Sequence, residues 1–240
     1  YNGDGIVISV VGNYDGERLR AELEKYFSKI SSGGGTEKIA APESVKSGIL
    51  IKQKDIEQCQ LCIAFEGMKR DDPLVYDLLA ANAVFGGSMS SRLFQKIREE
   101  NGLSYSVYSY INSYTKCGSL VIYAGMNPAE LEKVLELMNG EIKKLKEEKL
   151  GKTELLYAAE QIKSGLIMGL ESVSQRMSSY GKNLLLDGKI NTMENVIEKI
   201  SKISCDGAAE AIEKVFDISK MNIALLGSID KKDYGKNFSF

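Results

Sequence analysis

Runs and periodic spacings of apolar residues divide the chain into segments that predict strands and helices. Residues 6–12 form a short apolar run that ends at a glycine, which predicts a buried strand. In residues 17–30 the apolar positions recur every three to four residues, as on an amphipathic helix. Asp15 precedes this segment and predicts its N-terminal cap. Residues 31–47 contain consecutive glycines and a proline but few large apolar side chains, so they predict a linker.

The rest of the chain predicts a second, larger block. Strands are predicted at residues 48–54, 59–65, 104–111, 118–123 and 221–227. Helices are predicted at residues 71–85, 89–101, 127–148 and 153–186, followed by two shorter helices that begin near Asn191 and Ser204. Because the strands cluster instead of alternating with helices, we expect an α+β fold with an antiparallel or mixed sheet and helices on one face.

An internal similarity suggests how the chain is divided. Residues 6–15 align with residues 221–230, since each segment has an apolar strand, then glycine, then aspartate. This pattern is common enough that chance similarity is an alternative. If the repeat is real, residues 1–30 end one unit that begins upstream of Tyr1, which also predicts that the chain is a fragment or a processed product. Residues 48–230 would then be a complete second copy, with residues 231–240 as a tail.

Composition excludes several classes of function. The 240 residues include 31 Lys and Arg against 33 Asp and Glu, a net charge of −2 that gives no support for nucleic-acid or membrane binding. A hydrophobic fraction of 43% and a charged fraction of 27% are typical of a globular protein with a real core. The chain has no histidine, which excludes a Ser-His-Asp triad, a Cys-His pair and a His-ligated zinc site within it.

Cys59 and Cys62 form a C-x-x-C pair, which can indicate a redox site or half of a zinc site. They lie in a predicted strand, however, and residues three apart on a strand point to opposite faces. We therefore expect both to be small packing residues. Cys117 and Cys205 show no pairing pattern either, so the cysteines favour a reducing compartment, and we expect a cytoplasmic protein.

One longer motif in the chain is more specific than any of these patterns. Residues 86–107 read GGSMSSRLFQKIREENGLSYSV and closely resemble a stretch of the pitrilysin/insulinase family of zinc peptidases. The nearest branch is that of small bacterial members similar to mitochondrial processing peptidase, and the resemblance extends over nearly the whole chain. In that family two homologous α+β halves, joined by a linker, close around an unfolded peptide. The first half carries the zinc motif H-x-x-E-H.

In the same family the second half supplies an arginine and, seven residues later, a tyrosine that reach toward the substrate carbonyl. The resemblance places these roles on Arg98 and Tyr105. Arg98 ends a predicted helix and Tyr105 begins a predicted strand, so both can project from one rim. A guanidinium and a phenolic hydroxyl are hydrogen-bond donors that can hold a backbone carbonyl or a developing oxyanion. The simpler alternatives are an exposed arginine favoured by the helix dipole and a half-buried strand tyrosine.

The resemblance implies that this chain is the second half of such an enzyme. Zinc would lie on the missing N-terminal half, so the fragment alone would have no catalytic residue, no metal or other cofactor, and no activity. Its partners would be its own N-terminal domain and an extended peptide or unfolded protein, held by strand addition together with Arg98 and Tyr105. An apolar surface left bare by the missing half could also produce a homo-dimer.

The resemblance places one further loop near the substrate. Gly86, Gly87 and Ser88 correspond to a longer glycine-rich substrate loop in the non-catalytic subunit of processing peptidases. Only a short version is present here, which argues against a gating role, and a plain turn between helices is the alternative. A second reading of the whole chain is a non-catalytic peptide-binding or scaffold subunit of a processing-peptidase-like pair, and these residues do not separate the two.

Overall fold

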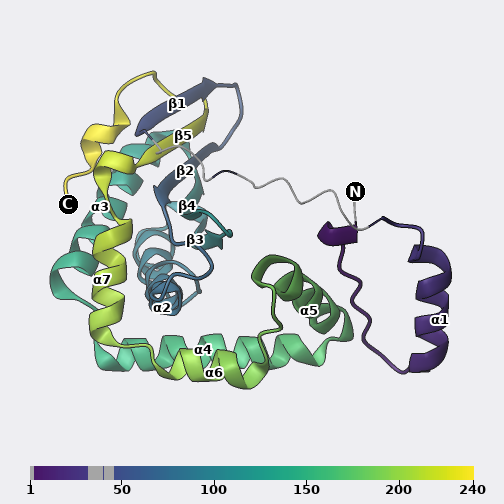
Figure 1. The fold of residues 1–240 in the computed structure, drawn as a ribbon. Coiled ribbons are helices and arrows are strands. Elements are labelled where there is room, and N and C mark those ends of the chain that lie inside the picture. Colours follow the sequence, from purple (N-terminus) through teal and green to yellow (C-terminus); the bar gives the residue numbers. More distant parts are fainter. Residues whose placement is uncertain (1–2, 32–39, 41–45) are drawn as a thin grey trace. The chain divides into compact units, whose positions relative to one another are not determined.

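A computed structural model describes residues 3–31, 40 and 46–240 (Figure 1). The chain forms two compact units, one from Tyr1–Ala40 and Lys163–Glu198 and the other from Ala41–Ile162 and Lys199–Phe240. Most of the predicted linker, at residues 31–47, lies outside the described residues. The predicted domain limits therefore stay predictions.

The larger unit contains a five-stranded mixed sheet in the order β1-β5-β2-β4-β3. Its strands are β1 (Gly48–Gln53), β2 (Cys59–Glu66), β3 (Ser104–Ser113), β4 (Gly118–Met126) and β5 (Asn222–Gly227). Only the β1–β5 pair is parallel, and every other neighbouring pair is antiparallel. The predicted α+β fold with a mixed sheet is therefore confirmed.

One face of the sheet carries the core. Along β2 the residues alternate between fully buried and half-exposed, starting from the buried Cys59, which shows that the two faces have different surroundings. Helices α2 (Val75–Phe85), α3 (Leu131–Glu148) and α7 (Cys205–Val215) contribute their buried residues to the same cluster. The ring of Phe216 lies 5.1 Å from that of Phe65 and 5.3 Å from that of Phe85, so it joins β2 to α2. The helices accordingly pack on one face, as predicted.

The C-terminal segment is part of this core. Residues 231–240, predicted as a tail, include a short 3-10 helix, Tyr234–Asn237. Tyr234 and Phe238 are buried, and the ring of Phe240 lies 6.2 Å from the ring of Phe65. These aromatic side chains therefore extend the hydrophobic cluster of the larger unit.

The smaller unit contains α1 (Gly16–Phe27) and α5 (Val173–Asp187). Asp15 caps α1 as predicted, because its carboxylate accepts hydrogen bonds from the backbone N–H groups of Glu17 and Arg18. The buried strand predicted at residues 6–12 is wrong, since these residues form no strand and Ile8 is 45% exposed. A strand needs a neighbouring strand with which to form backbone hydrogen bonds, and no described strand pairs with this segment.

Several predicted helices have different limits in the structure. The segment 153–186 is divided into α4 (Lys152–Glu171) and α5, because Ser172 has an extended backbone and its hydroxyl accepts a hydrogen bond from the N–H of Gln175. The helix predicted at 89–101 is shorter and contains a π-helical turn, η2 (Phe94–Glu99). The next helix, α6 (Met193–Ser201), is capped by Thr192 rather than by Asn191.

Candidate functional site

The π-helical turn η2 and the start of β3 bring Arg98 and Tyr105 together. A backbone bond from Glu100 N–H to the Gln95 carbonyl, at 2.9 Å, has the i→i+5 spacing of a π-helix. Gly102 then reverses the chain with φ +64°, a conformation that favours glycine. Its N–H donates to the carbonyl of Arg98 at 3.0 Å, so Arg98 and Tyr105 lie on opposite arms of one turn.

Tyr105 occupies a bulge at the beginning of β3. In the pairing of β3 with β4, Ser104 faces Met126 and Ser106 faces Gly125, so Tyr105 has no opposite residue. The hydroxyl of Ser104 lies within hydrogen-bond distance of the Ser106 and Gly125 carbonyls, at 2.8 and 2.7 Å, and holds this irregularity. Because a bulge redirects a side chain, Tyr105 projects outward and is 76% exposed.

Arg98 is in direct contact with Tyr105. One terminal nitrogen of its guanidinium donates a hydrogen bond to the Tyr105 carbonyl at 2.8 Å. The guanidinium carbon lies 5.2 Å from the centre of the Tyr105 ring and 4.9 Å from that of Phe94. The Arg98 side chain is 39% exposed, and its Nε lies 3.8 Å from a carboxylate oxygen of Glu99. The structure thus brings together the two residues that the sequence singled out.

Gly86 and Gly87 fit a close approach between the end of α2 and β3. The carbonyl of Gly86 accepts a hydrogen bond from the N–H of Ser109 at 2.8 Å, and Asn82 donates to the Ser109 carbonyl at 3.3 Å. A Cβ on Gly86 would lie 2.9 Å from the Ser109 nitrogen, and one on Gly87 would lie 3.0 Å from the Ala83 Cα. These glycines are therefore explained by packing, and none of their hydrogen bonds reaches Arg98 or Tyr105.

The same contacts cover the outer edge of β3. Both backbone groups of Ser109 bind the end of α2, so they face away from β4. The Tyr105 carbonyl, further along β3, is taken by Arg98. A peptide strand could not pair with β3 at these two positions without displacing the contacts. Strand addition next to Arg98, as expected from the sequence, is thus not supported by this geometry.

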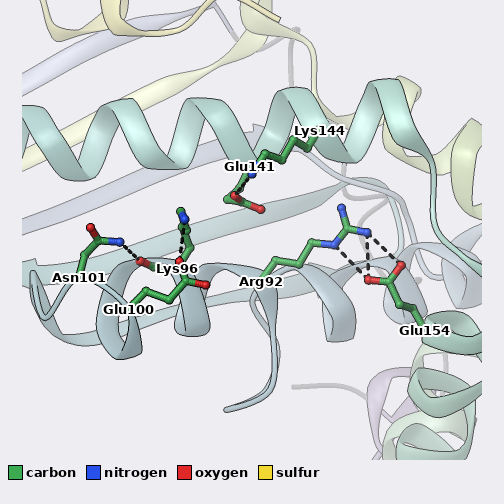
Figure 2. Close-up of polar contacts among 7 residues, drawn as sticks. All are labelled: Arg92, Lys96, Glu100, Asn101, Glu141, Lys144 and Glu154. Carbon is green, nitrogen blue, oxygen red and sulfur yellow. Dashed lines mark hydrogen bonds and ion pairs between the residues drawn. The ribbon is translucent and has the colours of Figure 1, made fainter.

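Ion pairs hold the segment that leads into η2. Figure 2 shows Arg92 binding Glu154 of α4 through two nitrogens, with N–O distances of 2.9 to 3.2 Å. Lys96 donates to Glu100 at 2.6 Å, which raises the pKa of Lys96. Arg92 and Glu154 also line a pocket of about 220 Å³ together with Ser88. Sequence reasoning missed the Arg92–Glu154 pair because nothing local connects two residues so far apart in the chain.

The C-x-x-C pair does not form a site. Cys59 is fully buried and Cys62 is half-exposed on the opposite face of β2, and both are unpaired. Burial raises the pKa of both thiols, which disfavours the reactive thiolate. Among the described residues, no group of three or more Cys, Asp or Glu side chains could hold a metal ion.

Comparison with known protein families shows which family this chain belongs to. Residues 1–162 match the family described as "Peptidase M16 inactive domain". The chain belongs to this family. Relatives of this chain that are named as zinc proteases confirm the predicted resemblance to zinc peptidases. A Bacillus subtilis protein named as an uncharacterized zinc protease is 38% identical over 206 residues, covering 86% of this chain and 50% of that protein.

A Rickettsia felis protein, also named as an uncharacterized zinc protease, is 33% identical over 235 residues, covering 98% of this chain and 56% of that protein. The chain thus spans about half the length of the curated relatives it matches. None of its described helices combines the length and apolar composition needed to cross a membrane.

Solved structures share the fold of the M16 inactive domain. A peptidase M16 inactive domain from Pseudomonas fluorescens has a TM-score of 0.80 at 21% identity, covering 92% of this chain and 53% of that one. A chain of complex III2 from Candida albicans also has a TM-score of 0.80 at 21% identity, with coverage of 94% and 56%. At this level of identity the similarity extends to the fold alone.

Proposed function

We propose that this M16 inactive domain is the second half of a two-domain zinc endopeptidase. It would pair with an N-terminal half, close the reaction chamber and hold an extended peptide or unfolded protein substrate. The zinc ion and the general base would belong to the other half, so the present chain would be inactive alone. The observation that carries this proposal is the direct contact between Arg98 and Tyr105 on an exposed rim.

The chemistry of this pair suits a neutral carbonyl. The hydrogen bond to Tyr105 uses one of the five N–H donors of the Arg98 guanidinium. Glu99, with its carboxylate oxygen 3.8 Å from Arg98, offsets the positive charge and makes a second carboxylate a poorer ligand. A backbone carbonyl, or an oxyanion that develops from it, matches the remaining N–H groups and the Tyr105 hydroxyl.

The peptide would be held by these side chains rather than as an added strand. The outer edge of β3 is taken at Tyr105 and Ser109, whereas β1 lies at the opposite edge of the sheet. A peptide paired with β1 would therefore be separated by four strands from β3, next to which Arg98 lies. Gly86, Gly87 and Ser88 would lie near the substrate path as a fixed turn and not as a gate.

Two substitutions test the proposal in the full-length protein, which contains both halves. We expect Arg98→Ala and Tyr105→Phe each to lower kcat/KM for a quenched fluorescent peptide by about a hundredfold to a thousandfold, the range for a lost oxyanion donor. Tyr105 is 76% exposed and Tyr105→Phe removes only its hydroxyl, so this variant should keep its melting temperature. Arg98 is 39% exposed and its replacement by alanine removes one hydrogen bond, so Arg98→Ala should lower the melting temperature by only about a few degrees.

Matched controls use residues of the same types elsewhere on the surface. Arg20→Ala in α1 and Tyr114→Phe at the end of the β3–β4 hairpin, both exposed, should leave turnover unchanged. Wild-type turnover in both Arg98→Ala and Tyr105→Phe would contradict the proposal.

A second candidate is a non-catalytic peptide-binding or scaffold subunit. The similarity in fold to a chain of complex III2 favours it, because that chain is part of a larger assembly. Zinc content and peptide hydrolysis of the full-length protein separate the two functions. Bound zinc together with hydrolysis supports the enzyme, whereas the absence of both supports the scaffold. The four unpaired cysteines fit a reducing compartment such as the cytoplasm under either function.

A further inference from the structure

The position of Arg98 depends on more than its hydrogen bond to Tyr105. A single bond to the Tyr105 carbonyl fixes one nitrogen of the guanidinium but leaves the plane of the group free to rotate about it. Binding a carbonyl in a defined direction requires that this plane be held as well. A neighbouring flat surface can supply that restraint, because guanidinium groups stack on aromatic rings.

Two rings are close enough to do so, and they differ in how firmly they are held. Tyr105 is 76% exposed, so its ring has little packing to fix it. Phe94 is partly buried and packs against the hydrophobic core. Its ring centre lies 4.9 Å from the guanidinium carbon of Arg98, within the range of a cation–π contact. Phe94 is therefore the more rigid of the two surfaces.

The helical turn itself aligns Phe94 with Arg98. Both residues belong to η2, four positions apart, which places their side chains on the same side of the turn. Leu93, immediately before η2, is fully buried, and Arg92 is bound to Glu154. The burial of Leu93 and the ion pair of Arg92 together hold the start of η2 in place, and they therefore also hold the backbone of Phe94.

We infer that Phe94 is a positioning residue that holds the plane of the Arg98 guanidinium for a substrate carbonyl. The identity of the substrate carbonyl rests on the proposed function. The contact between Phe94 and Arg98 does not. Phe94 does not contact the reacting groups itself. It limits the orientations of the Arg98 guanidinium before the peptide binds, so less conformational freedom of this group is lost in the transition state.

The test in the full-length protein uses Phe94→Leu, which keeps an apolar side chain but removes the aromatic face. We expect kcat to fall about fivefold, the scale of one cation–π contact, with KM unchanged. Phe94→Tyr keeps the aromatic face and should therefore retain the wild-type kcat. In an Arg98→Ala background Phe94→Leu should cause no further loss, because the group that it orients is absent.

The matched control is Phe240→Leu. Phe240 is also partly buried and packed on the core, and its ring lies 5.5 Å from the ammonium nitrogen of Lys146, outside the site. Its substitution should leave kcat unchanged. If Phe94→Leu lowers kcat equally with and without Arg98, its effect is purely structural and the inference is overturned.

A readout without activity separates this inference from the proposed function. In the ¹⁵N-labelled 240-residue chain, the Nε–H resonance of Arg98, assigned with Arg98→Lys, should move toward that of a free arginine in Phe94→Leu but not in Phe94→Tyr. An unchanged resonance in Phe94→Leu refutes the positioning role. Wild-type turnover of Arg98→Ala would instead refute the proposed function, and the resonance would then decide the inference alone.

Discussion

Asp72 shows how one carboxylate joins two helices of the larger unit. It lies just before α2 and accepts a hydrogen bond from Lys214 of α7 at 2.8 Å and another from the N–H of Leu74 at 3.0 Å. Burial opposes its ionisation, but the Lys214 and Leu74 bonds, with the charges of Lys214 and Lys69, outweigh it and lower the pKa of Asp72. The ionised form is therefore the one that stabilises the fold.

This residue gives a prediction about pH. Since the pKa of Asp72 is lower in the folded state, its stabilisation is present above the unfolded pKa of about 4 and is lost as pH falls through the folded pKa. Asp72→Asn should lower the free energy of unfolding by about 1 kcal/mol at pH 7. Urea denaturation should show this difference shrinking as pH falls below about 5.

The control for this prediction is the neighbouring Asp71. Its side chain is 73% exposed and pairs with Lys69 at 3.1 Å, so Asp71→Asn should have little effect at any pH. A deficit in Asp72→Asn that stays constant down to pH 3 would show that the charge of Asp72 is not the cause.

At the scale of elements, the junction between α2 and β3 depends on the absence of a side chain at Gly86. A Cβ there would lie 2.9 Å from the backbone nitrogen of Ser109, which is itself hydrogen-bonded to the Gly86 carbonyl. We expect Gly86→Ala to lower the free energy of unfolding by about 2 kcal/mol, as overpacking does. Thermal or urea unfolding of the 240-residue chain measures this loss.

Gly140 in the middle of α3 provides the opposite case. No atom lies within 4 Å of a Cβ placed there, so Gly140→Ala should raise stability by up to about 1 kcal/mol through helix propensity. Equal effects of the two alanine substitutions would show that the close approach at Gly86 is not what requires glycine.

The elements that sequence alone predicted correctly are those with local signals. Asp15 caps α1, and Gly102 ends the helical segment before β3, because each needs only its immediate neighbours. The five strands of the sheet were also found from their apolar runs. The break at Ser172 was missed because serine is tolerated inside helices, so the residue type alone does not indicate an end.

The features of the candidate site that the sequence did not predict have a different physical origin. The bulge at Tyr105 and the stacking of Phe94 depend on the register between strands and on packing, which no short pattern encodes. The spacing of Arg98 and Tyr105 did predict that they share a rim, because a helix end and a following strand start are adjacent. What the sequence could not predict is that β3 has its outer edge occupied.

At the scale of the whole molecule, the two units differ in how much apolar surface they bury. Neither α1 nor α5 contains a buried residue, whereas α7, only one residue shorter than α1, buries Ala208, Ala211, Ile212 and Val215. Since helices of this length are marginal without tertiary packing, the smaller unit should open far more readily than the larger one.

Hydrogen exchange of the 240-residue chain measures this difference. Backbone amides of α1 should exchange at least about a hundredfold faster than those of α7, because local opening of a helix without buried side chains costs little free energy. The comparison is matched in length and helix type. Equal protection of α1 and α7 would show that the smaller unit is stabilised by packing that burial does not reveal.

The occupation of the β3 edge at Tyr105 and Ser109 also bears on how this protein could aggregate. Exposed strand edges are templates for pairing with other chains, and here Asn82, Gly86 and Arg98 engage backbone groups of β3. At the other end of the described sheet, β1 pairs with β5 alone. Fibril growth by edge-to-edge stacking would therefore begin at β1, which makes this short strand the place where a solubilising lysine or proline would have the greatest effect.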